Sequence, residues 1–368
     1  MKLLKKSICI VLALMMVLTL GACHSKDEVA LTIEGIDIKT GLYLNALVDC
    51  DSDARAKVDE QLANKESDSS STEETDYYAQ QIDGLDYKEY VEMKTLERCK
   101  EFALYQKLAN DGVIKLTDEE LANAADYATN YWNSYGYGYL YGENGISVDT
   151  FKQVMIYSAY SNAYFMHIYG KGGEKEVAAE TIKKNMLDNY ALAYVLPASY
   201  PEGATADAKA ALKTKLEGFG KRLQKGEDFL KIYNELNGTN EKAPEKTKDG
   251  PKNVYARPIS EADSTDFDDV YEMKVGDYKV FETEDKTGLT LYVRLDINSD
   301  SYYLTSLNDT ILIDLKQDEF DKMIKETLAD FKVEENSWAL DRIDVEDIDY
   351  SAYQEFAKLS ICGNHSLN

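Results

Sequence analysis

"LTLYVRLDI", residues 289–297, alternates between two kinds of side chain over nine positions. Its odd-numbered residues are leucine, valine or isoleucine and point to one face of an extended chain. The residues between them, Thr290, Tyr292, Arg294 and Asp296, form a more polar face. This alternation predicts a β-strand, and "VGDYKVFET" (275–283) before it predicts a second one.

The chain before this strand pair predicts the rest of one domain. "ALAYVLPA" (191–198) is a short apolar stretch that predicts a strand. Leu212, Leu216, Phe219 and Leu223 follow with the spacing of one helix face, and "EDFLKIYNEL" (227–236) predicts a second helix. A strand, two helices and two strands make a compact α+β domain with an antiparallel sheet, over residues 191–298.

The segments on both sides of this domain predict helices. Thr117 and Glu120 have the spacing of a capping box, which marks the start of a helix. After the domain, residues 310–333 predict a long amphipathic helix with Leu312, Phe320, Ile324, Leu328 and Phe331 on one side. Because this apolar side needs a partner, we expect it to pack on the N-terminal helices. The 191–298 domain is then an insertion into a helical lobe.

The N-terminus has the pattern of a secretion signal. Three lysines precede an apolar run, and "LGAC" ends at Cys23. The run is shorter than the roughly 20 residues of a membrane span. The pattern resembles a bacterial lipobox, which predicts that residues 1–22 are a signal peptide and that Cys23 is the lipid attachment site. The protein is then expected on the extracytoplasmic face of the cell membrane, held there by its lipid anchor.

Charge and cysteine content exclude some classes of partner and site. The formal net charge is −26, and it becomes −29 without the three lysines of residues 1–22. So acidic a chain is not expected to bind nucleic acid, which requires clustered Lys and Arg. Beyond Cys23, the cysteines are Cys50, Cys99 and Cys362. Their spacing matches no metal motif, so no metal or other cofactor is predicted, and their pairing stays open, including a Cys50–Cys99 bridge.

The stretch "YWNSYGYGYLYGENG" (131–145) is rich in tyrosine and glycine and lies between two predicted helices. Tyrosine combines a rigid apolar ring with a polar edge and suits varied partners. One interpretation is a peptide-binding surface made by Tyr137, Tyr139 and Tyr141. The other is that Tyr131, Trp132 and Tyr135 pack inside the lobe while the glycines form a turn.

Five segments in order resemble the parvulin-type peptidyl-prolyl isomerases, the PrsA- and SurA-like foldase lipoproteins of Gram-positive bacteria. They are "VALTIEGIDIKTGLYL", "GVIKLTDEEL", "GEKEVAAETIKKNMLDNYALAYVLPA", "LQKGEDFLKIYNEL" and "MKVGDYKVFETEDKTGLTLYVRL". The resemblance implies an α+β protein in which a parvulin-like domain (191–298) is inserted into a helical, SurA- and trigger-factor-like chaperone lobe. The lobe spans 23–190 with 299–350, and 351–368 is a C-terminal tail.

The resemblance also implies a proline-binding groove in the 191–298 domain. The family's two catalytic histidines correspond to Tyr194 and Thr290, and this domain contains no histidine. The aromatic residue of the proline pocket corresponds to Phe267. No catalytic residue is therefore predicted. The residues expected to bind peptide are Tyr194, Leu196, Phe267, Thr290 and Tyr292.

The favoured function is a membrane-anchored extracytoplasmic foldase or chaperone that assists the folding of secreted proteins, with isomerase activity weak or lost. Its expected partners are unfolded or secreted polypeptides and the membrane. Two alternatives stay open: an active prolyl cis–trans isomerase with an atypical site, and an extracytoplasmic binding or adaptor lipoprotein. Whether the chain forms a homodimer is also left open.

Overall fold

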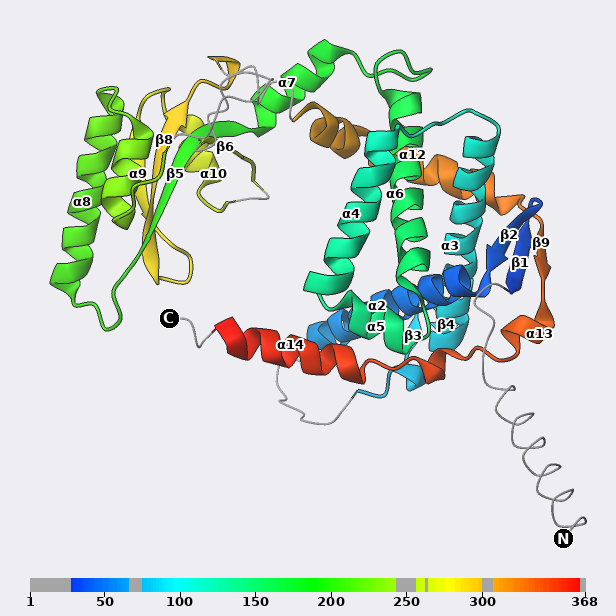
Figure 1. Ribbon diagram of the computed structural model, residues 1–368. Coiled ribbons are helices and arrows are strands. Elements are labelled where there is room, and N and C mark those ends of the chain that lie inside the picture. Colours follow the sequence, from blue (N-terminus) through cyan, green and yellow to red (C-terminus); the bar gives the residue numbers. More distant parts are fainter. Residues whose placement is uncertain (1–27, 66–74, 243–255, 262–263, 300–306, 365–368) are drawn as a thin grey trace, which may run out of the picture. The chain divides into compact units, whose positions relative to one another are not determined.

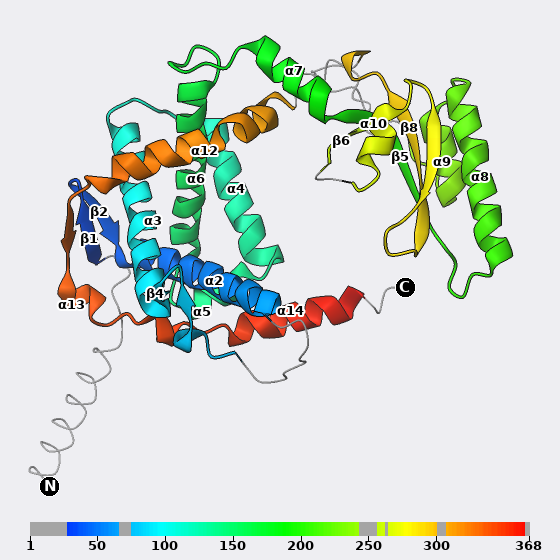
Figure 2. The same ribbon diagram turned by 180° about the vertical axis from the view of Figure 1, so that it is seen from behind.

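The computed structural model describes residues 28–65, 75–242, 256–261, 264–299 and 307–364 (Figures 1 and 2). The chain divides into two compact units. The helical unit consists of Met1–Ile168, Gly172–Glu174 and Glu319–Asn368, and the sheet unit of Tyr169–Lys171 and Lys175–Asp318. The fold is therefore α+β, with a sheet-containing unit inserted between two segments of a helical one, as the sequence predicts.

The helical unit begins with a β-hairpin that also binds the C-terminal segment. Strands β1 (Val29–Ile33) and β2 (Ile36–Lys39) pair antiparallel, and Gly35 in their turn has a φ of 79°. Such a backbone conformation favours glycine. β1 pairs on its other side with β9 (Val333–Glu335). Backbone hydrogen bonds thus join the two segments of this unit, although some 300 residues separate them in sequence.

Helices make up most of the helical unit. Its further elements before the insertion are α2 (Thr40–Lys65), η1 (Tyr77–Ala79), β3 (Gln81–Ile82), β4 (Leu85–Asp86), α3 (Tyr87–Asn110), α4 (Asp118–Ser134), α5 (Tyr137–Glu143) and α6 (Val148–Tyr169). Those after it are α13 (Ser337–Leu340), η3 (Val345–Asp347) and α14 (Ser351–Asn364). The predicted capping box of α4 is confirmed. The Thr117 hydroxyl accepts from the Glu120 N–H at 3.2 Å, and the Glu120 carboxylate accepts from the Thr117 N–H at 2.7 Å.

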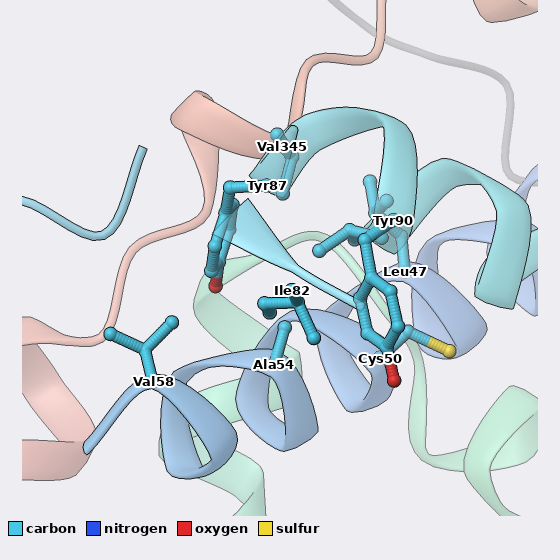
Figure 3. Packing of buried hydrophobic residues seen from close by; sticks show 9 residues of the cluster. Leu47, Cys50, Ala54, Val58, Ile82, Tyr87, Tyr90 and Val345 are labelled. Atoms are coloured by element: carbon cyan, nitrogen blue, oxygen red, sulfur yellow. The ribbon is translucent and has the colours of Figure 1, made fainter. Parts of the chain in front are cut away.

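One core cluster of the helical unit lies between α2 and α3. Leu47, Cys50, Ala54 and Val58 of α2 meet Tyr87 and Tyr90 of α3 around Ile82, and Val345 from the C-terminal segment joins them (Figure 3). Each of these side chains is buried. Burial of a large apolar side chain contributes about 1.5–3 kcal/mol, so this cluster is a main source of stability for the unit.

The sheet unit is built around four antiparallel strands in the order β6-β5-β8-β7. Its elements are α7 (Ala179–Asn189), β5 (Ala191–Ser199), α8 (Ala206–Gln224), α9 (Phe229–Asn237), β6 (Ala256–Ile259), α10 (Phe267–Glu272), β7 (Tyr278–Glu282), β8 (Gly288–Leu295) and η2 (Ile297–Ser299). The predicted strand, two helices and two strands are all present, and the structure adds β6 and α10 between α9 and β7. The sequence did not predict β6, which is a short edge strand that contains Pro258. It did not predict α10 either, because this helix is also short.

Both faces of this sheet are covered. Helices α8 and α9 cover one face, where Leu216 and Ile232 pack on Leu291. Helix α10 covers the other, where Phe267 and Val270 pack with Tyr292. The alternation predicted for 289–297 is therefore present, but its more polar face is not open to solvent. Thr290 is 9 % exposed and Tyr292 is 7 % exposed.

The long helix predicted near the C-terminus is α12 (Asn308–Ala329), and its two parts belong to different units. Ile311 near its start packs with Met186 and Ile297 in the sheet unit. Phe320 further along belongs to the helical unit, where its ring lies 5.3 Å from that of Phe165 in α6. The expected packing on the N-terminal helices thus applies to the second part of the helix.

Three further predictions concern the cysteine pairing, the C-terminal tail and the membrane anchor. Cys50 and Cys99 are buried free thiols, so the bridge left open by the sequence is not formed. Burial raises the pKa of the Cys50 thiol to about 12, which keeps it protonated. Residues 351–364 are helix α14 rather than a tail. Cys23 lies outside the described residues, and within them no helix has the length and apolarity to cross a membrane.

Candidate functional site

The tyrosine-rich stretch forms the end of α4, a turn, and α5. Gly136 makes the turn with a φ of 80°, and a Cβ atom at this position would lie 2.3 Å from the ring of Phe356. Glycine is therefore required both by the backbone conformation and by the close packing of α14. The turn brings Tyr137 of α5 against Tyr131 of α4, with ring centroids 5.7 Å apart. The stretch is thus an ordered aromatic cluster.

Side chains from this cluster line a hollow of about 760 Å³ within the helical unit. We call it the tyrosine groove. Its walls come from α2, η1, α3, α4, α5, α6 and the region of α14. The lining residues are Asp49, Ser52, Asp53, Arg55, Ala56, Asp59, Tyr77, Arg98, Phe102, Tyr131, Tyr137, Leu140, Tyr141, Phe151, Val154, Met155, Ser158, Tyr350, Tyr353 and Gln354. Its size lies in the range of ordinary ligand pockets.

An acidic side chain lies beside the rings of the groove. The Tyr141 hydroxyl donates to the Asp49 carboxylate at 2.5 Å. Burial raises the pKa of Asp49 to about 6, although the Tyr141 hydrogen bond and the nearby Arg98 guanidinium both act to lower it. Asp53 lies one helical turn further along α2 and is exposed. Its carboxylate interacts electrostatically with Arg98 and Lys57.

A second acidic residue of α2 binds Arg55, which lines the groove. Asp51 is fully buried and accepts from Arg55 Nε at 2.8 Å and from the hydroxyls of Tyr87 at 2.7 Å and Tyr350 at 2.8 Å. The Arg55 guanidinium carbon lies 4.6 Å from the ring centroid of Tyr77 and 4.7 Å from that of Tyr350. These are cation–π distances, so a carboxylate and tyrosine rings together bind this cation.

The groove combines aromatic rings with charged and polar groups. Its rings offer apolar faces, and its polar groups are carboxylates, guanidiniums, hydroxyls and the amide of Gln354. Among the residues that the structure describes, no group of three or more His, Cys, Asp and Glu side chains is arranged to hold a metal ion. A polypeptide segment with apolar or aromatic side chains has the chemistry that such walls accommodate.

The three tyrosines predicted to bind peptide have different positions. Tyr137 is half-buried and lines the groove. Tyr141 also lines it but is only 6 % exposed, so its ring is part of the core rather than an outward surface. Tyr139 is 50 % exposed, stacks on Phe356 at 5.3 Å and is not part of the lining. Of the alternative set, Tyr131 and Trp132 pack inside the unit, whereas Tyr135 is exposed.

In the sheet unit, the two positions that match the family's histidines do not meet. Tyr194 stands opposite Val293 in the β5–β8 pairing, whereas Thr290 stands opposite Pro197. Side chains alternate along a strand, so Tyr194 and Thr290 are on opposite faces of the sheet. Tyr194 stacks on Phe229 of α9, with ring centroids 4.3 Å apart. Leu196 is buried on the same face.

The other predicted residues of the sheet unit are together on the α10 face. Phe267 and Tyr292 belong to one buried cluster, and Phe281 of β7 packs against it and stands opposite Thr290. The Tyr292 hydroxyl lies 3.3 Å from that of Ser264. Since Tyr292, Phe267 and Thr290 are all less than a tenth exposed, they form a packed layer.

Several groove residues were not found from the sequence. Asp49, Arg98, Phe102 and Tyr353 come from helices that are far apart in the chain. One local signal was present, because Asp49 and Asp53 are four residues apart on a helix and therefore share a face. Nothing in the sequence alone shows that this face meets the tyrosine-rich stretch.

No family model and no curated protein sequence matches this chain. Among solved structures, the crystal structure of PrsA from Bacillus subtilis is similar, with 15% sequence identity and a TM-score of 0.35. The match covers 71% of this chain and 89% of that chain. A TM-score of this size does not establish a shared fold.

Proposed function

We propose that this protein is an extracytoplasmic, lipid-anchored chaperone that holds unfolded segments of secreted polypeptides in the tyrosine groove. The observation that carries the proposal is the groove itself, about 760 Å³ in volume and lined by rings from several helices and from Tyr350. Tyrosine and phenylalanine rings bind varied side chains with little loss of conformational entropy. Such a wall suits a partner whose sequence changes from one client to the next.

Aggregation of an unfolded client tests this function. The full chain in lipid nanodiscs should suppress aggregation of a reduced, unfolded secreted protein. The Tyr131→Ser/Tyr353→Ser variant should need roughly tenfold more protein for the same effect, because both rings line the groove. Tyr127→Ser is the matched control, since Tyr127 is 61 % exposed on α4 and lies outside the lining. Equal suppression by all three proteins would contradict the proposal.

Site-specific cross-linking tests directly whether the client lies in the tyrosine groove. Ser158 is an exposed groove residue on α6, so a photoreactive phenylalanine at 158 should cross-link to the client, and one at 127 should not. Cross-linking to one defined protein instead of many unfolded clients would favour the adaptor alternative.

The lipid anchor is the second part of the proposal, and it is supported by the lipobox-like "LGAC" ending at Cys23. We expect the wild-type chain to sediment with membranes and Cys23→Ala to be released from them. Cys9→Ala, a change within the same N-terminal segment, should leave sedimentation unchanged. A Cys23→Ala chain that stays fully with the membrane fraction would show that the anchor is not at this cysteine.

A further inference from the structure

The tyrosine groove has a charge pattern that the apolar rings alone do not explain. Three carboxylates line it, those of Asp49, Asp53 and Asp59, together with the two guanidiniums of Arg55 and Arg98. Arg55 is already paired with Asp51 at 2.8 Å, and Arg98 lies 3.5 Å from Glu101. The lining therefore keeps an excess of negative charge next to aromatic faces.

This excess is concentrated where the rings are. Asp49 touches Tyr141, whose ring packs edge-on to that of Tyr137 at 5.6 Å. Asp53 is on the same side of α2, one turn away, and its exposed carboxylate interacts electrostatically with Arg98 and Lys57. Carboxylates beside the faces of tyrosine rings attract a cation in two ways, by direct charge and by the ring quadrupole.

The chain itself contains a cation bound in this manner. Arg55 lies near the rings of Tyr77 and Tyr350 and pairs with the carboxylate of Asp51, and all three of Arg55, Tyr77 and Tyr350 line the groove. Asp49 and Asp53 line the groove together with Tyr131 and Tyr137, so carboxylates and aromatic rings are again combined there. The Arg98 guanidinium interacts electrostatically with both carboxylates and leaves the lining with more acidic than basic groups.

We infer that the tyrosine groove prefers client segments in which a lysine or arginine lies between aromatic or apolar residues, with the cation placed at Asp49 and Asp53. This inference rests on the proposed function and adds the class of client to it. The neighbouring rings receive the flanking side chains, and the carboxylates of Asp49 and Asp53 repel clients with an acidic residue at the same position.

Three peptides that differ at one position test the preference. Each is blocked at both ends and has the central sequence Phe-X-Tyr between Gly-Ser flanks, with X as lysine, glutamine or glutamate. Binding to the full chain in nanodiscs is measured by fluorescence anisotropy. We expect the lysine peptide to bind at least about fivefold more tightly than the glutamine peptide, and the glutamate peptide to bind most weakly. Raising the salt concentration should reduce the difference.

Substitutions identify the groups that are responsible. In Asp49→Asn/Asp53→Asn, affinity for the lysine peptide should fall to that for the glutamine peptide, which should itself be unchanged. Asn can still accept the Tyr141 hydrogen bond, and Asp53 is exposed, so the fold is expected to persist. The matched control is Asp126→Asn, because Asp126 is an exposed carboxylate of α4 outside the groove lining.

Two results would overturn the inference, and they differ in what they say of the proposed function. If all three peptides bind equally and Tyr131→Ser/Tyr353→Ser weakens them all, the groove holds peptides without regard to charge. If none of the three binds, both the charge preference and the proposed holding function fail.

Discussion

Asp49 lies at a partly buried position, and burial disfavours the ionised form of its carboxyl group. Burial raises its pKa to about 6, from an ordinary value near 4. Above pH 6 the folded protein therefore carries a charge in surroundings that disfavour it. An asparagine would make the same hydrogen bond with Tyr141 at no such cost. At neutral pH the Asp49 carboxyl group is mostly ionised, as the proposed preference for cationic client segments requires.

This conflict predicts a pH-dependent effect of Asp49→Asn on stability. The folded pKa lies above the unfolded one, so between about pH 4 and pH 6 the folded state binds more protons, and stability contributed by this group falls as pH rises. At pH 8 we expect the variant to be more stable than the wild type by up to roughly 3 kcal/mol. Near pH 4 the two should be about equal.

Denaturant unfolding of both proteins at pH 4 and pH 8 measures the difference. Asp126→Asn serves as the control, since it replaces an exposed carboxylate and should shift stability little at either pH. An Asp49→Asn effect of the same size at both values would mean that ionisation of Asp49 does not oppose folding.

The register between strands β5 and β8 determines which side chains share a face of the sheet. Their register places Tyr194 on the face that α9 covers, where its ring stacks on Phe229. Thr290 is on the other face and stands opposite Phe281 of β7. A pair of polar groups acting on one proline cannot be built from side chains on opposite faces of a sheet. The element arrangement therefore removes the polar pair that the resemblance implies, in addition to the missing histidines.

We expect the full chain to leave prolyl isomerisation of a short proline peptide at its uncatalysed rate. General acid–base contributions in enzymes are worth about 10²- to 10⁴-fold, and Tyr194 and Thr290, on opposite faces of the sheet, cannot supply them together. Exchange NMR on the peptide, with a histidine-bearing parvulin as the positive control, measures the rate. A rate close to that of the control would restore the isomerase alternative.

At the scale of the whole molecule, the inserted unit is larger than its sequence pattern indicates. The pattern predicts a domain at 191–298, but Met186 of α7 and Leu307 and Ile311 at α12 are part of the cluster that buries Leu192 and Ile297. Removing these residues would expose the apolar side chains that they cover. The compact unit extends accordingly from Lys175 to Asp318.

Two fragments test this boundary. We expect a 175–318 fragment to unfold cooperatively and a 191–298 fragment to be less stable by several kcal/mol, because removing Met186 and Ile311 takes away two large buried side chains. Urea midpoints followed by circular dichroism give the comparison. Equal midpoints would show that the 191–298 segment closes its core without α7 and α12.

Local patterns in the sequence determined most of the elements. The capping box at Thr117, the alternation of 289–297 and the apolar face of the C-terminal helix depend on neighbours a few residues away, so they can be recognised without the fold. The insertion of one unit into another also followed, because the apolar face of residues 310–333 requires a partner. Short elements such as β6 and α10 were not predicted, since they contain too few residues to show a periodic pattern.

Which residues share a surface was decided by the tertiary structure. Asp49 of α2, Phe102 of α3, Tyr137 of α5 and Tyr353 of α14 become neighbours because several helices pack together, and no local periodicity records that packing. The same holds for the burial of Thr290, because a helix covers the face that alternation alone marks as polar. Sequence determined the local conformation through nearby contacts, whereas long-range packing decided where the rings and charges of the groove would meet.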